Sequence, residues 1–574
     1  MAATLALLAG GASASAATVT VSPLPGTQDA STKTQISFLG APAGSISKVT
    51  VVGQRSGVHR GRLEAYSTGT GASFLLHAPL DQGERVRVTA TVGRDHVGTQ
   101  FTVARWARYQ GESGPTAAAP RTSAAPTVQS FVSAPRLQPP SVDVTTDAKG
   151  AITGDIFVAP DNGGGRYGPM ILGPQGQLVW FDPLPAHTRP MDFRVEQYQG
   201  QPDLVWWQGL IADIGVGYGV DEIYNSRYQK VAHVQAGNGY EADLHEIDIT
   251  PQGTAFITAY SLVHADLSAA GGSRDGTLLE PVVQEIDIKT GLVMLQWDPL
   301  GRVLLTDAYT HPLSPGRPWD WFHLNSISLG PGNTALLDSR NTWAAYDVSL
   351  SSGQILWRVG GKHSTFKMGP GTEMAYQHDA ELQAGNTISV FDDGDYPPVH
   401  RQSRVIRLQI NWHTLTVNLV DQIVHTNALL SPSQGNDQPL ANGDSFVGWG
   451  QAGYFSEFSP TGATLFDAHF PGAGQSYRAY VFPWSGTPAS PPAVAAKETG
   501  RTTDTIYASW NGATSVAGWR VFAGPDSAHL AQVAQVPATG FQTTIPISTT
   551  GRAFLVQAVN AAGAVLRTSR TTTD

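Results

Sequence analysis

The feature of this sequence that most restricts its fold is a two-part repeat in the middle of the chain. One half is a glycine turn followed by an apolar strand, as in "TPQGTAFITAY", "GPGNTALLDSR", "QAGNTISVFDD" and "ANGDSFVGWG". The other half is a polar turn and a strand with an aromatic residue, as in "DIKTGLVMLQWD" and "SLSSGQILWRVG". The turn glycines lie about 50 to 80 residues apart; they are Gly253, Gly332, Gly385 and Gly443. Two such hairpins form a four-stranded sheet, and sheets repeated at this period predict a β-propeller.

We therefore predict an all-β protein in which residues 142–484 form a propeller of about six blades, at about 55 to 60 residues per blade. A β-helix or a long sandwich is the competing fold, but neither favours so long a repeat. The composition agrees, because only 14% of the residues are charged while the chain contains 62 Gly and 38 Pro. This mixture is typical of strands and turns rather than of helical bundles.

Regions of different composition flank the predicted propeller. Residues 17–108 alternate apolar and polar positions, as in "RVRVTATVG", which predicts an immunoglobulin-like β-sandwich. Residues 109–141 are rich in Pro, Ala, Ser and Thr and predict a linker. Residues 490–574, with Trp510 and the strand "GWRVF", resemble a fibronectin type III module with a spacing or attachment role.

The N-terminal residues predict export. Residues 1–16 hold a short apolar run that ends in Ala14 and Ala16, spaced as an A-x-A cleavage signal. A disordered Ala-rich tail is the alternative. The run is too short to span a bilayer and no later segment approaches the length of a membrane span, so we predict a secreted or cell-surface protein without a membrane span.

Charge and cysteine content exclude several classes of function. The net charge of −10 argues against nucleic acid or an anionic membrane as a partner. The absence of cysteine excludes disulfides, thiolate metal sites and cysteine nucleophiles. The acidic run "DDGD" from Asp392 to Asp395 is spaced as a turn rather than as a calcium loop. We predict neither a metal nor a cofactor.

Histidines recur at matching points of the repeat. His245 lies eight residues before Gly253, His323 nine before Gly332 and His378 seven before Gly385. In the next repeat, Asn436 lies seven residues before its turn glycine. The inner strands of a propeller begin around a central channel, so we expect the imidazoles and this carboxamide to face one volume. Each histidine alone could simply cap a strand, but capping does not require imidazole in successive repeats.

Further polar residues fall near these histidines. Asn325 follows His323 by two residues and shares its side of a strand, and Arg340 ends the next strand. Arginine offers a rigid fork of donors that suits a tetrahedral oxyanion. Asp379 is adjacent to His378, but strand neighbours point to opposite faces, so we do not expect it to be the partner of this histidine. Paired carboxylates are missing from this set, which argues against glycoside hydrolysis.

The segments "DWFHLNSI", "SRNTWAAYDV", "GQILWRVGGKHSTF", "QHDAEL", "SQGNDQ", "FVGWG" and "SYRAYVFPW" resemble the bacterial arylsulfotransferase family. The resemblance covers roughly residues 142–484. It implies a six-bladed propeller with an N-terminal β domain. It also implies transfer of a sulfuryl group from a phenolic sulfate ester to a phenol, through a sulfurylated histidine and without a nucleotide donor.

Carried over by motif, the resemblance implies the following roles. His378 matches the nucleophile, His323 and Asn325 the His-x-Asn pair, Arg340 the arginine and His245 the remaining histidine. Since "GGKHSTF" lacks the phosphate-loop pattern, it agrees with a nucleotide-free reaction, and Lys362 and His363 are predicted to lie in a loop between blades.

Two tryptophans and one asparagine are predicted to contact the substrate. Trp321 and Trp449 lie in or near these segments and are candidates for stacking on the aryl ring, with blade packing as the alternative; Asn436 is a candidate contact for the sulfuryl group. One departure is that better studied relatives carry a Lys-Thr pair where this chain has "SQGNDQPL", so Gln434, Asn436 or Arg478 would have to substitute.

Two other functions remain open at this stage. One is an exported propeller without catalytic activity that acts as a binding or scaffold protein. The other is a quinone-dependent dehydrogenase, which would need a calcium site and a tryptophan motif in every blade, whereas only some of the repeats here contain Trp. The sequence also leaves open whether the chain forms homodimers.

Overall fold

The computed structural model describes residues 19–107, 128–148, 150–312 and 317–573, and these are almost wholly β-strand. The helical elements among them are short 3-10 turns: η1 (Ala43–Ser45), η2 (Ser268–Ala270), η3 (Leu305–Asp307), η4 (Arg340–Thr342) and η5 (Gly450–Ala452). The all-β prediction is therefore confirmed. The predicted export signal at residues 1–16 lies outside the described residues, as does most of the predicted linker at 109–141.

The N-terminal residues form two four-stranded antiparallel sheets. Alternate strand positions are buried between the two sheets, where Phe38, Val88 and Phe101 share one apolar cluster. The first sheet contains β1 (Thr20–Ser22), β2 (Ile36–Leu39), β6 (Gly71–Leu76) and β5 (Gly61–Ala65), in that spatial order. The second contains β4 (Gly57–His59), β3 (Ile46–Gly53), β7 (Arg85–Val92) and β8 (Asp95–Thr102).

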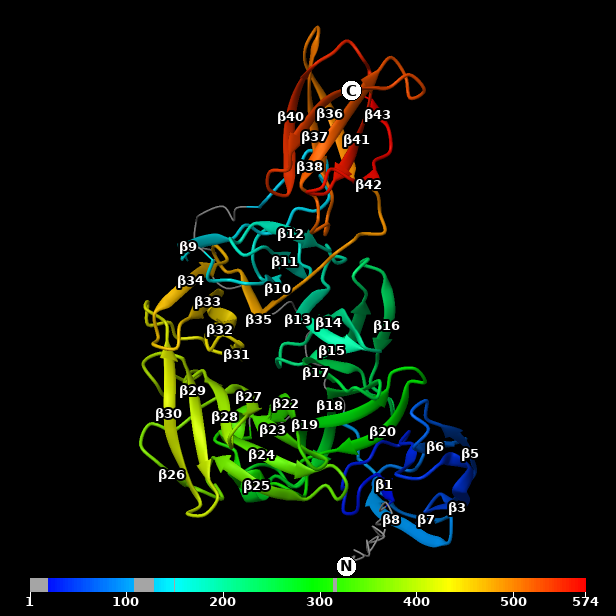
Figure 1. The fold of residues 1–574 in the computed structure, drawn as a ribbon. Helices are drawn as coiled ribbons and strands as arrows, with labels where there is room; N and C mark the ends of the chain where they lie inside the picture. The colour runs from blue at the N-terminus through cyan, green and yellow to red at the C-terminus, as the bar shows by residue number, and fades with distance from the viewer. Residues whose placement is uncertain (1–18, 108–127, 149, 313–316, 574) are drawn as a thin grey trace, which may run out of the picture.

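The middle of the chain forms antiparallel sheets that lie side by side in chain order around a common centre (Figure 1). The first sheet contains β10 (Asp155–Asp161), β11 (Met170–Leu172) and β12 (Leu178–Phe181). The second contains β13 (Arg189–Tyr198), β14 (Gln201–Ile211), β15 (Gly217–Tyr224) and β16 (Lys230–Val234). The third contains β17 (Ala242–Ile249), β18 (Thr254–Ala265), β19 (Gly276–Asp287) and β20 (Leu292–Trp297), with β21 (Trp319–Asp320) beside β19. A single pairing, Gly219 with Ala242, joins the second and third sheets.

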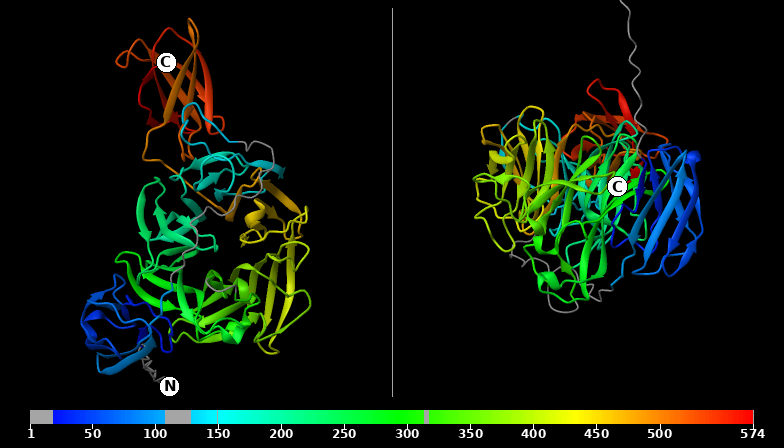
Figure 2. Two further views of the ribbon diagram at one scale, coloured as in Figure 1. Left: turned by 180° about the vertical axis from the view of Figure 1, so that it is seen from behind. Right: turned by 90° about the horizontal axis from the view of Figure 1, so that it is seen from below.

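The remaining sheets continue the same order around the centre (Figure 2). The fourth sheet contains β22 (Leu324–Gly330), β23 (Thr334–Ser339), β24 (Ala344–Ser349) and β25 (Ile355–Gly360). The fifth contains β26 (Lys367–Met368), β27 (His378–Gln383), β28 (Thr387–Asp392), β29 (Arg404–Asn411) and β30 (Thr416–Val424). The sixth contains β31 (Asn436–Pro439), β32 (Ser445–Gly448), β33 (Tyr454–Phe458) and β34 (Thr464–His469).

Two strands distant in sequence close this arrangement. β35 (Gln475–Phe482) pairs with β10 in the first sheet, and β9 (Asp143–Asp147) pairs with β34 in the last. The early and late parts of the region therefore share two sheets, so neither end can leave without breaking strand pairs. Apolar clusters fill the spaces between neighbouring sheets, as where Leu336 and Val359 meet Ile388 and Leu408.

The C-terminal residues form two further sheets beyond β10–β12 (Figure 1). One contains β36 (Ala493–Gly500), β37 (Thr503–Ser509) and β40 (Gln542–Ser548); the other contains β38 (Gly518–Gly524), β39 (Ala531–Pro537), β41 (Ala553–Val559), β42 (Val565–Thr568) and β43 (Thr572–Thr573). Trp510 and Trp519 lie in the apolar core between them. Asn511 exchanges two hydrogen bonds with the backbone of Phe181, which ties these sheets to the first sheet of the middle region.

Candidate functional site

The innermost strands of several sheets share an irregularity near their beginning. The pairing register shifts between Ala242 and Ile247 in β17, between Leu324 and Ser326 in β22, and after His378 in β27. Such bulges redirect side chains and are frequent beside functional sites. His245 lies within the first of them, His323 immediately precedes β22, and His378 is the first residue of β27.

The structure brings the three predicted histidines together. The ring centroids of His245 and His323 are 5.0 Å apart, and those of His323 and His378 are 6.5 Å apart. The ring of Tyr477, from β35, lies 5.8 Å from His245 and 6.4 Å from His378. All three imidazoles are buried, with exposures of 3%, 8% and 1% in chain order. Strands from three different sheets thus supply one histidine cluster.

Each histidine of this cluster has a carboxylate at its Nδ1 atom. Nδ1 of His323 lies 2.6 Å from Asp320 Oδ2, and Nδ1 of His378 lies 2.8 Å from Asp393 Oδ2. Nδ1 of His245 contacts Oδ2 of Asp243. With Nδ1 held in this way, the Nε2 atom of each ring is the one left for chemistry.

A backbone amide identifies the tautomer of His378. The N–H of Gln434 donates to Nε2 of His378 at 3.3 Å. An N–H group cannot accept a hydrogen bond, so Nε2 carries a lone pair and the ring proton lies on Nδ1, facing Asp393. Gln434 itself has a φ of 73°, and Gly435 follows with a φ of 108° against the ring of Phe391. A side chain on Gly435 would meet that ring, which explains glycine here.

Burial and neighbouring cations favour neutral imidazoles. Burial lowers the pKa of His378 well below its usual value, and the charge of Arg340 adds to this effect. Burial also lowers the pKa of His323, although Asp320 opposes the shift. Burial raises the pKa of Asp393 well above its usual range, with Arg340 acting against it. A neutral His378 with a free Nε2 lone pair is a nucleophile over a wide pH range.

Arg340 lies in the turn that follows β23, beside the cluster. Its backbone N–H donates to the carbonyl of His323 at 3.0 Å. Its guanidinium donates to the carbonyl of Pro432 at 3.2 Å and lies 4.7 Å from the ring centroid of Tyr376. It also donates to the amide oxygen of Asn341 at 3.1 Å, and among the described residues no carboxylate forms an ion pair with it, so its charge remains available for an anionic group.

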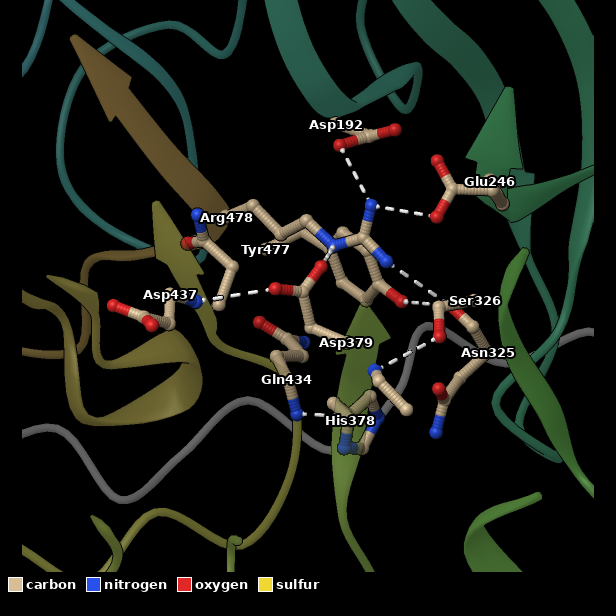
Figure 3. Close-up of polar contacts among 12 residues, drawn as sticks. Asp192, Glu246, Asn325, Ser326, His378, Asp379, Gln434, Asp437, Tyr477 and Arg478 are labelled. Atoms are coloured by element: carbon tan, nitrogen blue, oxygen red, sulfur yellow. Dashed lines mark hydrogen bonds and ion pairs between the residues drawn. The ribbon is translucent and has the colours of Figure 1, made fainter. Parts of the chain in front are cut away.

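A second arginine, Arg478, lies among acidic side chains near His378 (Figure 3). Arg478 is 1% exposed, and its guanidinium forms ion pairs with Asp192 at 3.3 Å, Glu246 at 2.9 Å and Asp379 at 3.2 Å. It also donates to the carbonyl of Asn325 at 3.2 Å. Three carboxylates therefore surround this buried guanidinium.

Asp379 and Asn325 hold neighbouring strands in place. Figure 3 shows the Asp379 carboxylate turned toward Arg478, away from the ring of His378. The prediction that Asp379 is not the partner of His378 thus agrees with the geometry, since Asp393 occupies that place. Asn325 is fully buried, and its Nδ2 donates to the carbonyl of Gln377 at 2.8 Å. It therefore links β22 to the residue before His378.

Three residues that were predicted to contact the substrate are instead buried within the fold. Trp321 and Trp449 have no exposed surface, and their indole N–H groups donate to Glu280 and Ser456. Asn436 is also fully buried and exchanges two hydrogen bonds with the backbone of Ala479. Neighbouring sheets cover both indole rings, so this geometry does not fit the predicted stacking, and the Asn436 amide is already satisfied within the fold.

The aspartates at Nδ1 are the residues that the sequence interpretation missed. Two of them are marked locally, as Asp243 in "DLH" and Asp320 in "DWFH". The third, Asp393, lies in the acidic run that was read as a turn. It reaches His378 because β27 and β28 pair with His378 opposite Phe391, two residues before Asp393. Only the register of that hairpin reveals the contact.

Among the described residues, no group of three or more His, Asp or Glu side chains is arranged to hold a metal ion. No helix in the same part of the chain is long and apolar enough to cross a membrane.

Part of the chain matches a known protein family. Residues 194–471 match the family described as arylsulfotransferase (ASST), a range that includes His245, His323, Arg340 and His378. No curated protein matches the chain by sequence.

The solved structures that match this chain are distant in sequence and have TM-scores below 0.5. A protein of unknown function from Bacteroides caccae is 12% identical, with a TM-score of 0.36, covering 57% of this chain and 98% of its own. A catalytically inactive virginiamycin B lyase from Staphylococcus aureus is 10% identical, with a TM-score of 0.29, covering 65% and 96%. A quinoprotein alcohol dehydrogenase-like protein from Bacteroides thetaiotaomicron is 9% identical, with a TM-score of 0.25, covering 79% and 91%.

Proposed function

Residues 194–471 of this chain belong to the arylsulfotransferase family, and from this premise we propose that the chain transfers a sulfuryl group from a phenolic sulfate ester to a phenol. His378 is the nucleophile, and no nucleotide takes part. The observation that carries the proposal is the buried, neutral His378, whose Nδ1 is held by Asp393 and whose Nε2 faces the site beside Arg340. Two further imidazoles and the charge of Arg340 near this ring distinguish it from a buried histidine that serves only packing.

In the first half-reaction, Nε2 of His378 attacks the sulfur of the aryl sulfate. The N–S bond forms as the bond from sulfur to the aryl oxygen breaks, and the electron pair of that bond leaves with the phenolate. The sulfuryl oxygens need donors in the transition state. We assign this role to the guanidinium of Arg340 and to the N–H of Gln434, which points at Nε2 in the resting site. The Gln434 segment thus takes the place of the Lys-Thr pair of relatives.

The proton of the phenol passes through a second histidine. His323 takes the proton of the incoming acceptor phenol as its oxygen attacks the sulfur of the sulfurylated His378. The resulting imidazolium then protonates the next leaving phenolate, so protons balance over the two half-reactions. His245, 5.0 Å from His323 by ring centroids, shares this task. Asp320 and Asp243 orient these rings through Nδ1.

We propose the finer architecture together with the function. The sheets of residues 142–484 form a six-bladed propeller that carries the site. Residues 17–108 form an immunoglobulin-like module and residues 490–574 a fibronectin type III-like module, each built from two facing sheets around its own core. Export remains a prediction from residues 1–16.

The deciding experiment is an assay with a chromogenic aryl sulfate, with and without a phenol acceptor. We expect phenol-dependent release of the chromophore with ping-pong kinetics. Mass spectrometry of protein treated with donor alone is expected to find one sulfuryl group on the peptide that contains His378. A chain that binds several aryl sulfates but releases no chromophore and gains no sulfuryl group would instead be the binding or scaffold propeller.

The Asp393→Asn variant tests the tautomer of His378. An Asn amide can donate to Nδ1 and so place the ring proton on Nε2, which removes the attacking lone pair. We expect sulfurylation of His378 to slow by about 10²-fold or more. In the wild type, His378 should gain a proton only below the usual histidine pKa of about 6.5, because burial lowers the pKa of this imidazole. The value of kcat/KM should therefore be level above that pH and fall on the acid side.

The matched control for this variant is Asp395→Asn. Asp395 is also buried and lies two residues away, but its carboxylate accepts from the N–H of Tyr396. This control should keep the wild-type rate. Equal losses in the two variants would contradict the role of Asp393.

The His323→Asn variant tests the proton transfer. A nitrophenolate leaves without protonation, whereas the phenolate of an unactivated phenol needs a proton. We therefore expect a small loss with p-nitrophenyl sulfate as donor and a loss about 10²-fold larger with phenyl sulfate. Single-turnover rates for a series of donors of rising phenol pKa would measure this. An equal loss across the series would assign His323 a structural role.

A further inference from the structure

Outside the histidine cluster, three aromatic rings form a row that begins at Arg340. The rings of Tyr309 and Trp343 are stacked, with centroids 3.7 Å apart and planes 9° apart. The edge of Trp343 meets Tyr376 at 5.2 Å and 74°. The guanidinium of Arg340 covers Tyr376, with its Cζ 4.7 Å from the ring centroid.

The backbone anchors this row to the site. Trp343 ends the 3-10 turn η4 that starts with Arg340, and Tyr376 comes two residues before His378. The N–H of Tyr309 donates to the carbonyl of Asn341, in the same turn, at 2.8 Å. The row therefore has a fixed position relative to Arg340 and His378.

The rings of the row are not ordinary core residues. Trp343 and Tyr376 both have a φ of 54°, a left-handed conformation that bulky side chains rarely adopt. Trp343 and Tyr309 are only partly buried, and none of the three rings belongs to the neighbouring apolar clusters of the described residues. The indole Nε1 of Trp343 is buried yet has no hydrogen-bond partner among the described residues. Strained aromatic residues with an unused donor beside a reactive site point to a ligand.

A cation stands at each end of the row. Arg340 covers one end, and Nζ of Lys362 lies 4.8 Å from the ring centroid of Tyr309 at the other. Lys362 is held by the carbonyls of Thr306 and Ala308 at 2.8 and 2.6 Å. Lys362 belongs to the segment "GGKHSTF", and the proposed reaction assigns no role to this lysine. In a chain with a net charge of −10, two cations flanking three aromatic rings favour an aromatic anion.

We propose that Tyr309, Trp343 and Tyr376 form the binding wall for the aryl part of the substrate. The preferred class is a fused-ring aryl sulfate that carries a carbonyl or hydroxyl oxygen. The sulfate lies toward Arg340, the ring packs on Trp343, and the ring oxygen accepts from the free indole N–H. This inference rests on the proposed function for the identity of the sulfate, and it replaces Trp321 and Trp449 as the aromatic contacts.

The test is equilibrium binding, which does not depend on turnover. In a His378→Ala background, 4-methylumbelliferyl sulfate and hexyl sulfate are titrated with and without Trp343→Leu. We expect the added substitution to raise Kd for the aryl sulfate about tenfold and to leave Kd for hexyl sulfate within about twofold. In the otherwise wild-type enzyme, Trp343→Leu should raise KM for the aryl donor while kcat at saturation is retained.

The matched control is Trp412→Leu. Trp412 is also a partly exposed tryptophan in an aromatic cluster, with Trp357 and Phe366, but it lies in the β29–β30 turn at the far end of its sheet from His378. It should leave both Kd values unchanged. An aryl sulfate Kd that Trp343→Leu does not alter, or equal losses for both ligands, would overturn the inference. Absence of turnover in the wild type with intact, Trp343-dependent binding would overturn the proposed reaction and leave the binding wall standing.

Discussion

Replacing His378 with alanine is expected to abolish sulfuryl transfer, lowering kcat/KM by at least about 10³-fold. The imidazole is proposed to form the covalent bond to sulfur. Its Nε2 is the atom toward which the N–H of Gln434 points, and its Nδ1 is held by Asp393. The variant should also carry no sulfuryl group after incubation with an aryl sulfate alone, which mass spectrometry measures directly.

The control for this loss is His425→Ala. His425 is 2% exposed and bonded to Asp467 at 3.0 Å, so its surroundings match those of His378, but it packs against Trp449 between sheets. This variant should lose stability and retain activity per folded molecule. Chromophore release that survives His378→Ala would remove this residue as the nucleophile and, with it, the sulfohistidine mechanism.

The largest expected effect on stability is that of Arg478→Met. The substitution keeps an unbranched apolar side chain but removes the charge that faces Asp192, Glu246 and Asp379, all buried. Removing one member of a buried ionic cluster leaves the others without compensation, which costs about 3–5 kcal/mol of unfolding free energy. Denaturant unfolding measures this loss. Arg105→Met, which removes an arginine that is 51% exposed and paired with Asp275, should cost at most about 1 kcal/mol.

The loss in Arg478→Met should shrink as the pH falls. Burial raises the pKa of Asp379 to about 7 even with Arg478 present, and removing this cation raises it further. When the folded state raises the pKa of a carboxyl group, the protonated group stabilises the fold. This contribution is complete at pH values below the unfolded-state pKa of about 3.9. That contribution is lost as the pH rises through the folded pKa. The variant should therefore be closer to wild type at about pH 5 than at about pH 8, and a pH-independent difference would contradict this account.

Much of the architecture could be predicted because it depends on local pattern. The turn glycines at 253, 332, 385 and 443 each lie between paired strands, and three of them have a φ between 73° and 80° that favours glycine. The same repeat aligned His245, His323 and His378, which the structure brings into one cluster. The family resemblance is confirmed over residues 194–471.

The repeat was less informative about what surrounds each matching position. Asn436 occupies a position like that of the histidines, yet its amide pairs with the backbone of Ala479 in β35. Trp321 and Trp449 stand near the site segments in the sequence, yet both rings face neighbouring sheets and are fully buried. Burial of a ring depends on which sheet packs against it, and the sequence of one strand does not contain that information.

The sequence by itself determined the all-β class, the family and the three histidines, because strand periodicity and turn glycines act over a few residues. Only the tertiary structure decided how those histidines are held. Asp393 reaches His378 across the β27–β28 hairpin, and Arg340 reaches the same site from the preceding sheet. The tautomer and low pKa of His378 follow from these contacts and from burial, since electrostatic effects depend on distance through space rather than along the chain.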